Sequence, residues 1–158
     1  MSKQELYREI NMQVEAICEG EPNLIANLSN VSAILFDRLE QVNWAGFYLI
    51  TDNLAGNGKE LVLGPFQGKA ACVRIPVGRG VCGTAAETLS TQLIYDVHEF
   101  EGHIACDAAS NSEVVVPLIV NDVVVGVLDI DSPVVARFDQ EDQKGLEQVA
   151  RFVESIWN

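Results

Sequence analysis

Apolar residues recur every three or four positions in three stretches of the chain, at 3–18, 24–39 and 140–157. This is the period of an amphipathic helix, so each stretch is predicted to be helical. Gly20 and Pro22 interrupt the pattern and separate the first two helices. In the first helix, the side that faces the core is expected to carry Leu6, Ile10, Val14 and Ile17.

Between these helices, shorter segments bounded by turn residues predict a sheet. Strands are expected at 42–51, 60–66, 71–76, 92–97, 113–120 and 123–130. Asn121 and Asp122 join the last two strands as a hairpin, and a short helix is expected at 80–89 after a glycine-rich turn. This order predicts an α+β fold, a mainly antiparallel sheet with flanking helices, in a single domain spanning 1–158.

Charge and composition narrow the possible partners. The formal net charge of the 158 residues is −13, which argues against binding to nucleic acid or to an anionic membrane. No apolar run reaches the roughly 18 residues of a membrane helix. The polar N-terminus does not resemble a signal peptide, so we expect a cytoplasmic protein. A structural disulfide framework is not expected in that compartment.

Three of the four cysteines, Cys72, Cys82 and Cys106, fall in loops or at the starts of elements. A thiol must be reachable to act as a nucleophile, so this placement suggests thiol chemistry. Cys106 lies in the long segment 98–111, three residues after His103 and next to Asp107. A nearby imidazolium would lower the pKa of the Cys106 thiol, and a nearby carboxylate would raise it. The alternative is that Cys106 is an unremarkable, partly buried thiol.

The other cysteines differ in context. Cys82 follows Gly80 near a helix start, where a thiolate would be stabilised, although the glycines could equally form only a tight turn. Cys72 is expected to open the strand 71–76, and Cys18, beside an apolar stripe, is expected to be structural. There is no close cysteine pair of the kind that binds zinc, so no metal site is predicted.

Acidic residues gather at one end of the last hairpin. Asp129 and Asp131 are two residues apart on a strand, so their side chains point to the same face. Glu113 begins the neighbouring strand and could join them. Acids held together raise one another's pKa, so one could keep a proton at neutral pH while another binds an ammonium group. The alternative is a solvent-facing strand end, with Asp131 starting a turn.

Trp44 and Tyr48 share one face of the strand 42–51 and could either line a pocket or fill the core. The turn around Gly78 and Gly80 lacks the Lys-Ser/Thr pair of a phosphate-binding loop, so nucleotide binding by that route is not expected.

Five motifs together closely resemble the free methionine-(R)-sulfoxide reductases, a family of stand-alone GAF domains, over nearly the whole chain. The Cys106 motif is long and specific, whereas the Asp129–Asp131 motif alone would be weak. The motifs are Asn43-Trp44-Ala45-Gly46-Phe47-Tyr48, Leu63-Gly64-Pro65-Phe66-Gln67-Gly68, Gly78-Arg79-Gly80-Val81-Cys82-Gly83-Thr84-Ala85, Gly102-His103-Ile104-Ala105-Cys106-Asp107-Ala108-Ala109-Ser110-Asn111-Ser112-Glu113 and Leu128-Asp129-Ile130-Asp131-Ser132.

The resemblance implies a role for each matching residue. Cys106 would attack the sulfoxide sulfur, Cys72 would resolve the sulfenic acid as a disulfide that thioredoxin reduces, and Cys82 would be an auxiliary resolving thiol. The acids would bind the free amino acid and assist oxygen protonation, and the aromatics would surround the substrate side chain; these residues are Glu113, Asp129, Asp131, Trp44 and Tyr48. The resemblance implies no cofactor. It does imply a homodimer.

Two alternatives remain at this stage. GAF domains often bind small molecules as sensors, although such sensors are normally fused to an output domain, for which this chain has no room. A redox sensor that switches through a Cys72–Cys106 disulfide without turnover is the second alternative. Steady consumption of thioredoxin-derived reductant in the presence of substrate would separate an enzyme from either.

Overall fold

The structure is a computed structural model that describes residues 1–102 and 109–158. The predictions made for His103 and Cys106 therefore lie outside the described residues. The elements are α1 (Lys3–Cys18), α2 (Leu24–Arg38), β1 (Trp44–Asp52), β2 (Lys59–Gly68), β3 (Arg74–Pro76), α3 (Gly80–Thr88), β4 (Gln92–Ile94), the 3₁₀ helix η1 (Val97–Glu99), β5 (Ser112–Val120), β6 (Val123–Ser132) and α4 (Gln140–Ser155).

The six strands form one antiparallel sheet in the order β3-β2-β1-β6-β5-β4. The hairpin between β5 and β6 turns at Asn121 and Asp122, whose φ angles are 52° and 65°. Two successive left-handed residues are the requirement of a type I′ turn, which matches the twist of the strands it joins. The predicted hairpin is therefore confirmed, and it sets the register of the acidic residues.

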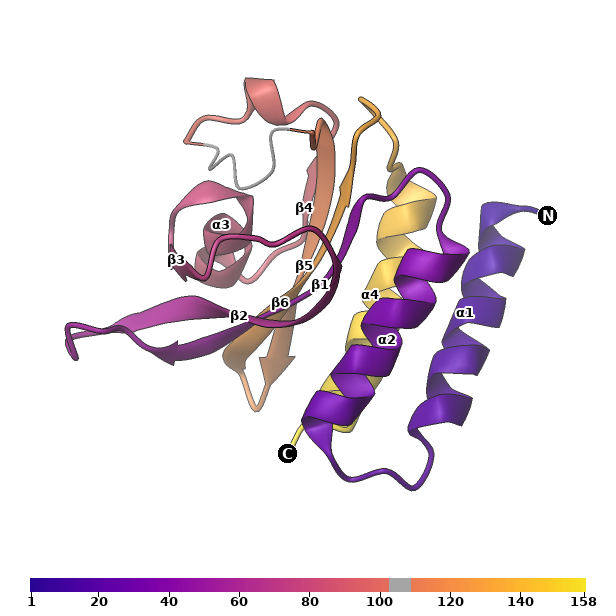
Figure 1. Cartoon of the computed structure of the whole chain (residues 1–158), viewed down its shortest axis with the longest axis horizontal. Helices are drawn as coiled ribbons and strands as arrows, with labels where there is room; N and C mark the ends of the chain where they lie inside the picture. The colour runs from indigo at the N-terminus through magenta and orange to yellow at the C-terminus, as the bar shows by residue number, and fades with distance from the viewer. Residues whose placement is uncertain (103–108) are drawn as a thin grey trace.

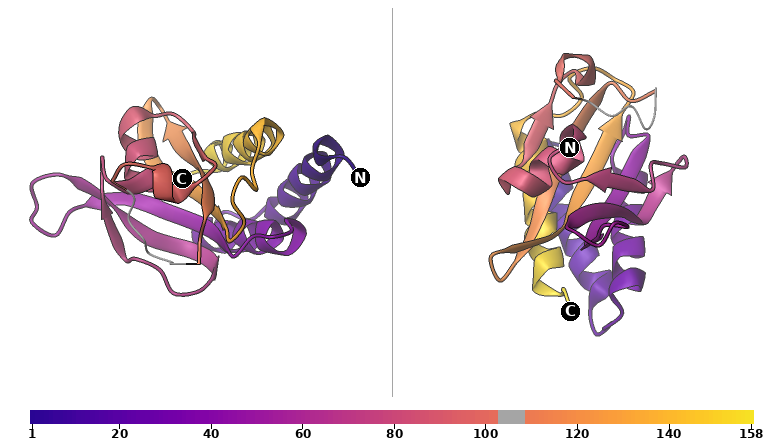
Figure 2. Two further views of the ribbon diagram at one scale, coloured as in Figure 1. Left: turned by 90° about the horizontal axis from the view of Figure 1, so that it is seen from above. Right: turned by 90° about the vertical axis from the view of Figure 1, so that its left-hand side faces the viewer.

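Helices cover the two faces of the sheet unequally (Figure 1). On one face, α2 and α4 pack on the strands and α1 packs outside them, so that α1 forms the outer edge of this side (Figure 2). The larger apolar core lies here and includes Phe47, Leu128 and Leu146. On the other face, α3 packs on β5 and β6 over a smaller apolar cluster that includes Trp44 and Tyr48. Because both faces of β1 are covered, its first five residues are all buried.

The ends of the long helices are set by side chains that accept hydrogen bonds from backbone N–H groups. Ser2, Asn23 and Asp139 cap α1, α2 and α4, and at α4 Asp142 completes a capping box. Among the described residues, no helix combines the length and the apolar character that crossing a bilayer requires.

Three predicted boundaries were wrong. Strand β3 is shorter than expected, so Cys72 lies in the connection before it rather than at the opening of a strand. The strand predicted at 92–97 ends at Ile94, because Val97 begins a 3₁₀ turn whose N-cap is Asp96. Strand β6 continues to Ser132, so Asp131 lies within the sheet and does not start a turn.

Candidate functional site

The register of the sheet brings the three predicted acids together on the face covered by α3. Glu113 on β5 lies directly opposite Asp131 on β6, and Asp129 follows two residues along the same strand. The next strand, β1, places Trp44 opposite Asp131 and Gly46 opposite Asp129. Because side chains two residues apart share a face, these positions form one continuous patch. The predicted convergence of the acids is therefore present in the structure.

Two of the acids are almost completely buried: Glu113 is 8% exposed and Asp129 is 4% exposed. Burial, followed by the neighbouring charge of Asp129, raises the pKa of Glu113 well above its usual range. Burial, followed by the charge of Asp131, does the same to the pKa of Asp129. The alternative of a solvent-facing strand end is wrong for these two residues. In the described structure, Asp129 Oδ1 is buried and has no hydrogen-bond partner.

Cys82 approaches the acids from above the sheet, because α3 carries it in its first turn. Its Sγ lies 3.3 Å from Asp129 Oδ2 and 4.0 Å from Glu113 Oε2. The helix start predicted at Cys82 is present, but the surroundings of Cys82 do not stabilise a thiolate. Burial, followed by the charges of Asp129 and Glu113, raises the pKa of the Cys82 thiol well above its ordinary value. This thiol is therefore protonated at neutral pH.

An aromatic cluster adjoins the acids. Trp44 stacks on Tyr48 and on Phe66, with ring centroids 5.8 and 5.1 Å apart. The Trp44 Nε1–H donates to the carbonyl of Lys69 at 3.1 Å, and the Tyr48 hydroxyl donates to the carbonyl of Cys72 at 2.9 Å. Trp44 and Tyr48 are both buried and belong to the smaller apolar cluster. Burial, followed by the charge of Asp129, raises the pKa of Tyr48.

The sequence reasoning did not single out Phe66, although it belongs to one of the quoted motifs. Its place depends on Gly46, the facing residue of β1: a Cβ at Gly46 would lie 2.3 Å from the Cβ of Phe66. Gly46 therefore allows β1 and β2 to bring the rings of Trp44 and Phe66 into contact. A glycine in the middle of an aromatic strand was the signal of this close approach.

The cysteines fall into two groups. Cys18 and Cys82 are free thiols, and both are buried. Cys18 lies in the larger core, which agrees with the structural role predicted for it. Cys72 is disulfide-bonded and sits just before β3, with its carbonyl held by Tyr48. The assignments of Cys106 as nucleophile and of Cys72 as its resolving partner stay predictions.

The same cluster defines which side chains could contact a cation. Within the described part of the chain, one group qualifies: Cys82, Glu113 and Asp129, whose donor atoms all lie within 4.8 Å of one another. These residues offer three metal-ligand atoms, whereas a structural zinc site uses four ligands.

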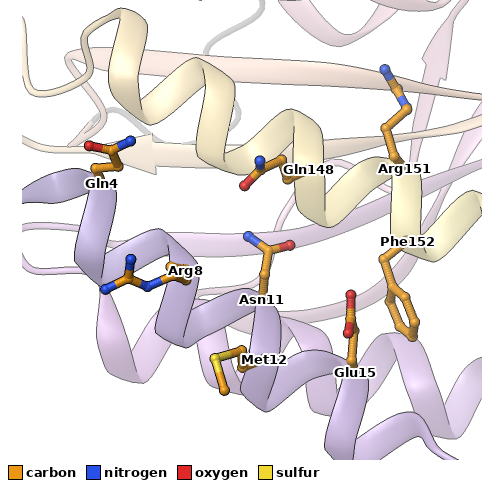
Figure 3. Close-up of a pocket in the computed structure, with 8 residues that line it drawn as sticks. All are labelled: Gln4, Arg8, Asn11, Met12, Glu15, Gln148, Arg151 and Phe152. Carbon is orange, nitrogen blue, oxygen red and sulfur yellow. The ribbon is translucent and has the colours of Figure 1, made fainter.

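A separate cleft lies on the opposite side of the molecule, between α1 and α4. It has a volume of about 630 Å³. Figure 3 shows its lining, in which charged and amide side chains of both helices lie beside Met12 and Phe152. It holds no cysteine and none of the predicted site residues, so it is not a candidate for thiol chemistry. The residues that line it are Gln4, Arg8, Asn11, Met12, Glu15, Gln148, Arg151 and Phe152.

The curled antiparallel sheet with α3 on one face and three helices on the other is the architecture of a GAF domain, and the GAF domain family model matches residues 25–157. The free methionine-R-sulfoxide reductase of Escherichia coli is 55% identical over 156 residues, which cover 99% of this chain and 91% of that protein.

Two solved structures agree. The fRMsr of Staphylococcus aureus, in complex with substrate, has a TM-score of 0.87 at 50% identity and covers 95% of this chain and 94% of its own. The free methionine-R-sulfoxide reductase of Neisseria meningitidis, in complex with its substrate, has a TM-score of 0.91 at 42% identity, covering 99% and 90%. The chain belongs to the free methionine-R-sulfoxide reductase family of GAF-domain enzymes. The predicted fold class and the family resemblance are confirmed.

Proposed function

We propose that this protein reduces free L-methionine-(R)-sulfoxide to L-methionine with cysteine thiols and is recycled by thioredoxin. The observation that carries the proposal is the acidic patch of Glu113, Asp129 and Asp131, of which the first two are buried, and in which Asp129 Oδ1 has no hydrogen-bond partner within the described structure. A buried carboxylate oxygen with no partner costs free energy, so a ligand that donates a hydrogen bond to it is expected. Two relatives solved in complex with their substrate support a substrate-binding role for a chain of this family.

The patch suits a free amino acid better than a residue in a peptide, because only the free amino acid carries an α-ammonium group. We assign Asp129 and Asp131 to this ammonium. In the empty site, burial and mutual repulsion raise the pKa of Asp129, but an ammonium held beside it favours the ionised carboxylate. Glu113, whose pKa is also raised, keeps its proton and can donate it to the sulfoxide oxygen.

The chemical steps follow from the requirements of sulfoxide reduction. The thiolate of Cys106 attacks the sulfoxide sulfur while Glu113 supplies a proton to the oxygen. The S–O bond of the substrate breaks, the substrate sulfur is reduced to the thioether of methionine, and the oxygen ends on Cys106 as a sulfenic acid. The thiol of Cys72 then attacks that sulfur, water leaves and a disulfide forms. Thioredoxin supplies two thiols and restores the reduced protein.

The position of Cys72 is consistent with the resolving role, since it is disulfide-bonded in this structure. Direct resolution requires the α-carbons of Cys72 and Cys106 to come within about 4.4–6.8 Å of each other in the oxidised protein. We place the protein in the cytoplasm, because a cycle that ends in a disulfide needs a reducing compartment to return to the dithiol.

We also propose that two copies pair through the exposed side of α1. Arg8 and Glu15 are exposed, line the same cleft and have no ion-pair partner in the described part of the chain (Figure 3). They are equidistant from the midpoint between Asn11 and Met12. An antiparallel pairing of α1 with its copy about that midpoint would bring each Arg8 to the other copy's Glu15, as an isologous interface requires.

The function is tested by a single turnover of the fully reduced protein with free methionine-R-sulfoxide and no external reductant. We expect the unmodified protein to form about one methionine per protein, Cys72→Ser also to form one, and Cys106→Ser to form none. The Cys72→Ser variant should then stall, because its sulfenic acid has lost the preferred partner. Equal methionine from Cys106→Ser and the unmodified protein would overturn the nucleophile assignment.

A sensor that binds but does not turn over remains the competing function. In that case the reduced protein would bind the sulfoxide with its thiols unchanged, and no methionine would accumulate in any variant. A redox sensor that the sulfoxide oxidises once would also release one methionine, so sustained thioredoxin-dependent methionine formation is the measurement that separates such a sensor from the enzyme.

A further inference from the structure

Cys82 has chemical surroundings that differ from the auxiliary resolving role implied by family resemblance. It is 4% exposed, and its Sγ lies 3.3 Å from Asp129 Oδ2. The protonated thiol carries a single S–H donor, and a carboxyl group offers acceptor oxygens in either protonation state. The contact is a hydrogen bond in which Cys82 donates and Asp129 Oδ2 accepts.

These surroundings suit a hydrogen-bond donor and not a nucleophile. Attack on another sulfur requires the thiolate. Burial and two neighbouring carboxyl groups oppose removal of the proton from Cys82, and this raises its pKa. A resolving thiol at this position would have to ionise between acids that repel the product of that ionisation.

The backbone keeps Cys82 in place. The neighbouring Gly83 lies so close to β3 that a Cβ on it would be 2.5 Å from the carbonyl oxygen of Pro76. Its own carbonyl accepts a hydrogen bond from the N–H of Gly78 at 2.9 Å. The first turn of α3 is thus fixed against the turn that precedes it, and the thiol points to a fixed place on the sheet.

The two oxygens of Asp129 consequently have different roles. Oδ2 accepts the hydrogen bond from Cys82, whereas Oδ1 is buried and has no partner among the described residues. We propose that Cys82 is a positioning residue, whose thiol holds Asp129 Oδ2 so that Oδ1 is presented to the ammonium group of free methionine sulfoxide. This inference rests on the proposed function, and it assigns Cys82 to substrate binding rather than to disulfide exchange.

The test compares Cys82→Ser, which keeps a hydrogen-bond donor but no redox chemistry, with Cys82→Ala, which keeps neither. With free methionine-R-sulfoxide and thioredoxin, we expect Cys82→Ser to retain the KM of the unmodified protein within about threefold. Cys82→Ala should raise KM about tenfold with kcat little changed, because Asp129 then loses the donor that orients its carboxyl group toward the ammonium, and a net hydrogen bond corresponds to about a tenfold change. Calorimetric binding of L-methionine should show the same order of affinities.

Cys18→Ala is the matched control, because Cys18 is an equally buried free thiol in the other core, and its KM should be unchanged. A resolving thiol predicts the opposite pattern: Ser and Ala would fail equally in repeated turnover, and KM would not respond. Equal KM values for the two Cys82 variants would overturn the inference while leaving the proposed function intact. An unmodified protein that forms no methionine would overturn both.

Discussion

At the scale of single residues, the site is an arrangement that folding alone would not favour. Glu113 and Asp129 are buried acids whose pKa values are raised first by burial, and then by the charge of Asp129 at Glu113 and by the charge of Asp131 at Asp129. Such a group either keeps its proton or carries a poorly solvated charge, which costs free energy. Perturbed carboxyl groups of this kind cluster at functional sites, and here they coincide with the residues that the sequence had nominated.

The division of labour among the acids predicts different kinetic defects. Glu113→Gln should lower kcat by about 10²–10⁴, because general acid catalysis acts in the transition state. Asp129→Asn and Asp131→Asn should mainly raise KM, because they remove the charge that binds the ammonium in both the ground and the transition state. The measurement is kcat and KM for free methionine-R-sulfoxide. Near-normal values of both constants in all three variants would show that the acids do not form the binding site.

The raised pKa of Glu113 also predicts how stability depends on pH. Because the folded protein holds this proton more tightly than the unfolded chain, stability is fully present below the unfolded pKa of about 4.3 and is lost as pH rises through the folded pKa. Glu113→Gln removes this titration. Its unfolding free energy, measured with urea, should therefore exceed that of the unmodified protein at pH 9 and approach it near pH 4.

The slope contributed by one such group is at most about 1.4 kcal/mol per pH unit. Glu99→Gln, at an exposed position, serves as the control and should follow the unmodified protein at every pH. Parallel curves for Glu113→Gln and the unmodified protein would contradict the assignment of a buried, protonated carboxyl group.

At the scale of elements, Gly145 shows how packing can override local preference. It lies inside α4, where glycine costs about 1 kcal/mol relative to alanine. A Cβ at this position, however, would lie 2.1 Å from Cγ of Tyr7 on α1. The ring cannot retreat easily, because Tyr7 is buried and its hydroxyl donates to Asp142 Oδ1 at 2.7 Å. The glycine therefore sets the close approach of α1 and α4.

Gly145→Ala should accordingly destabilise the protein, by about 1–3 kcal/mol, even though alanine favours the helix. Lys144→Ala, at the exposed neighbouring position, changes helix propensity little and should be nearly neutral. Urea unfolding of the two variants measures the difference. A Gly145→Ala variant as stable as the unmodified protein would show that the two helices can separate without cost.

The same scale shows how far the sequence could predict the fold and the site. The hairpin at Asn121 was predictable because its turn chemistry is local, and the common face of Asp129 and Asp131 followed from strand periodicity. The environment of Cys82 was not predictable from the sequence, because it depends on how α3 packs on the sheet. A helix start alone suggested a lowered pKa, and tertiary burial reversed the sign. Strand β4 was predicted too long, to residue 97, because Asp96 caps a 3₁₀ turn that begins at Val97.

At the scale of the whole molecule, α1 is the outermost helix (Figure 2). Its exposed side carries the opposite charges of Arg8 and Glu15. If two copies pair through this side, Arg8→Glu should place like charges together at two symmetric positions and weaken the dimer. Glu15→Arg should do the same, and the double reversal should restore pairing. Sedimentation equilibrium at low salt measures the dissociation constants. A double variant as monomeric as either single variant would contradict the proposed interface.

The proposed chemistry has two parts: the acidic patch selects a free amino acid, and the thiols reduce its sulfoxide. The most direct measurement follows thioredoxin-dependent methionine formation from three compounds, which are free methionine-R-sulfoxide, the free S epimer and a peptide-bound R-sulfoxide. We predict sustained turnover with the free R epimer and little with the other two. Equal turnover of the peptide-bound sulfoxide, or none with the free R epimer, would contradict the account.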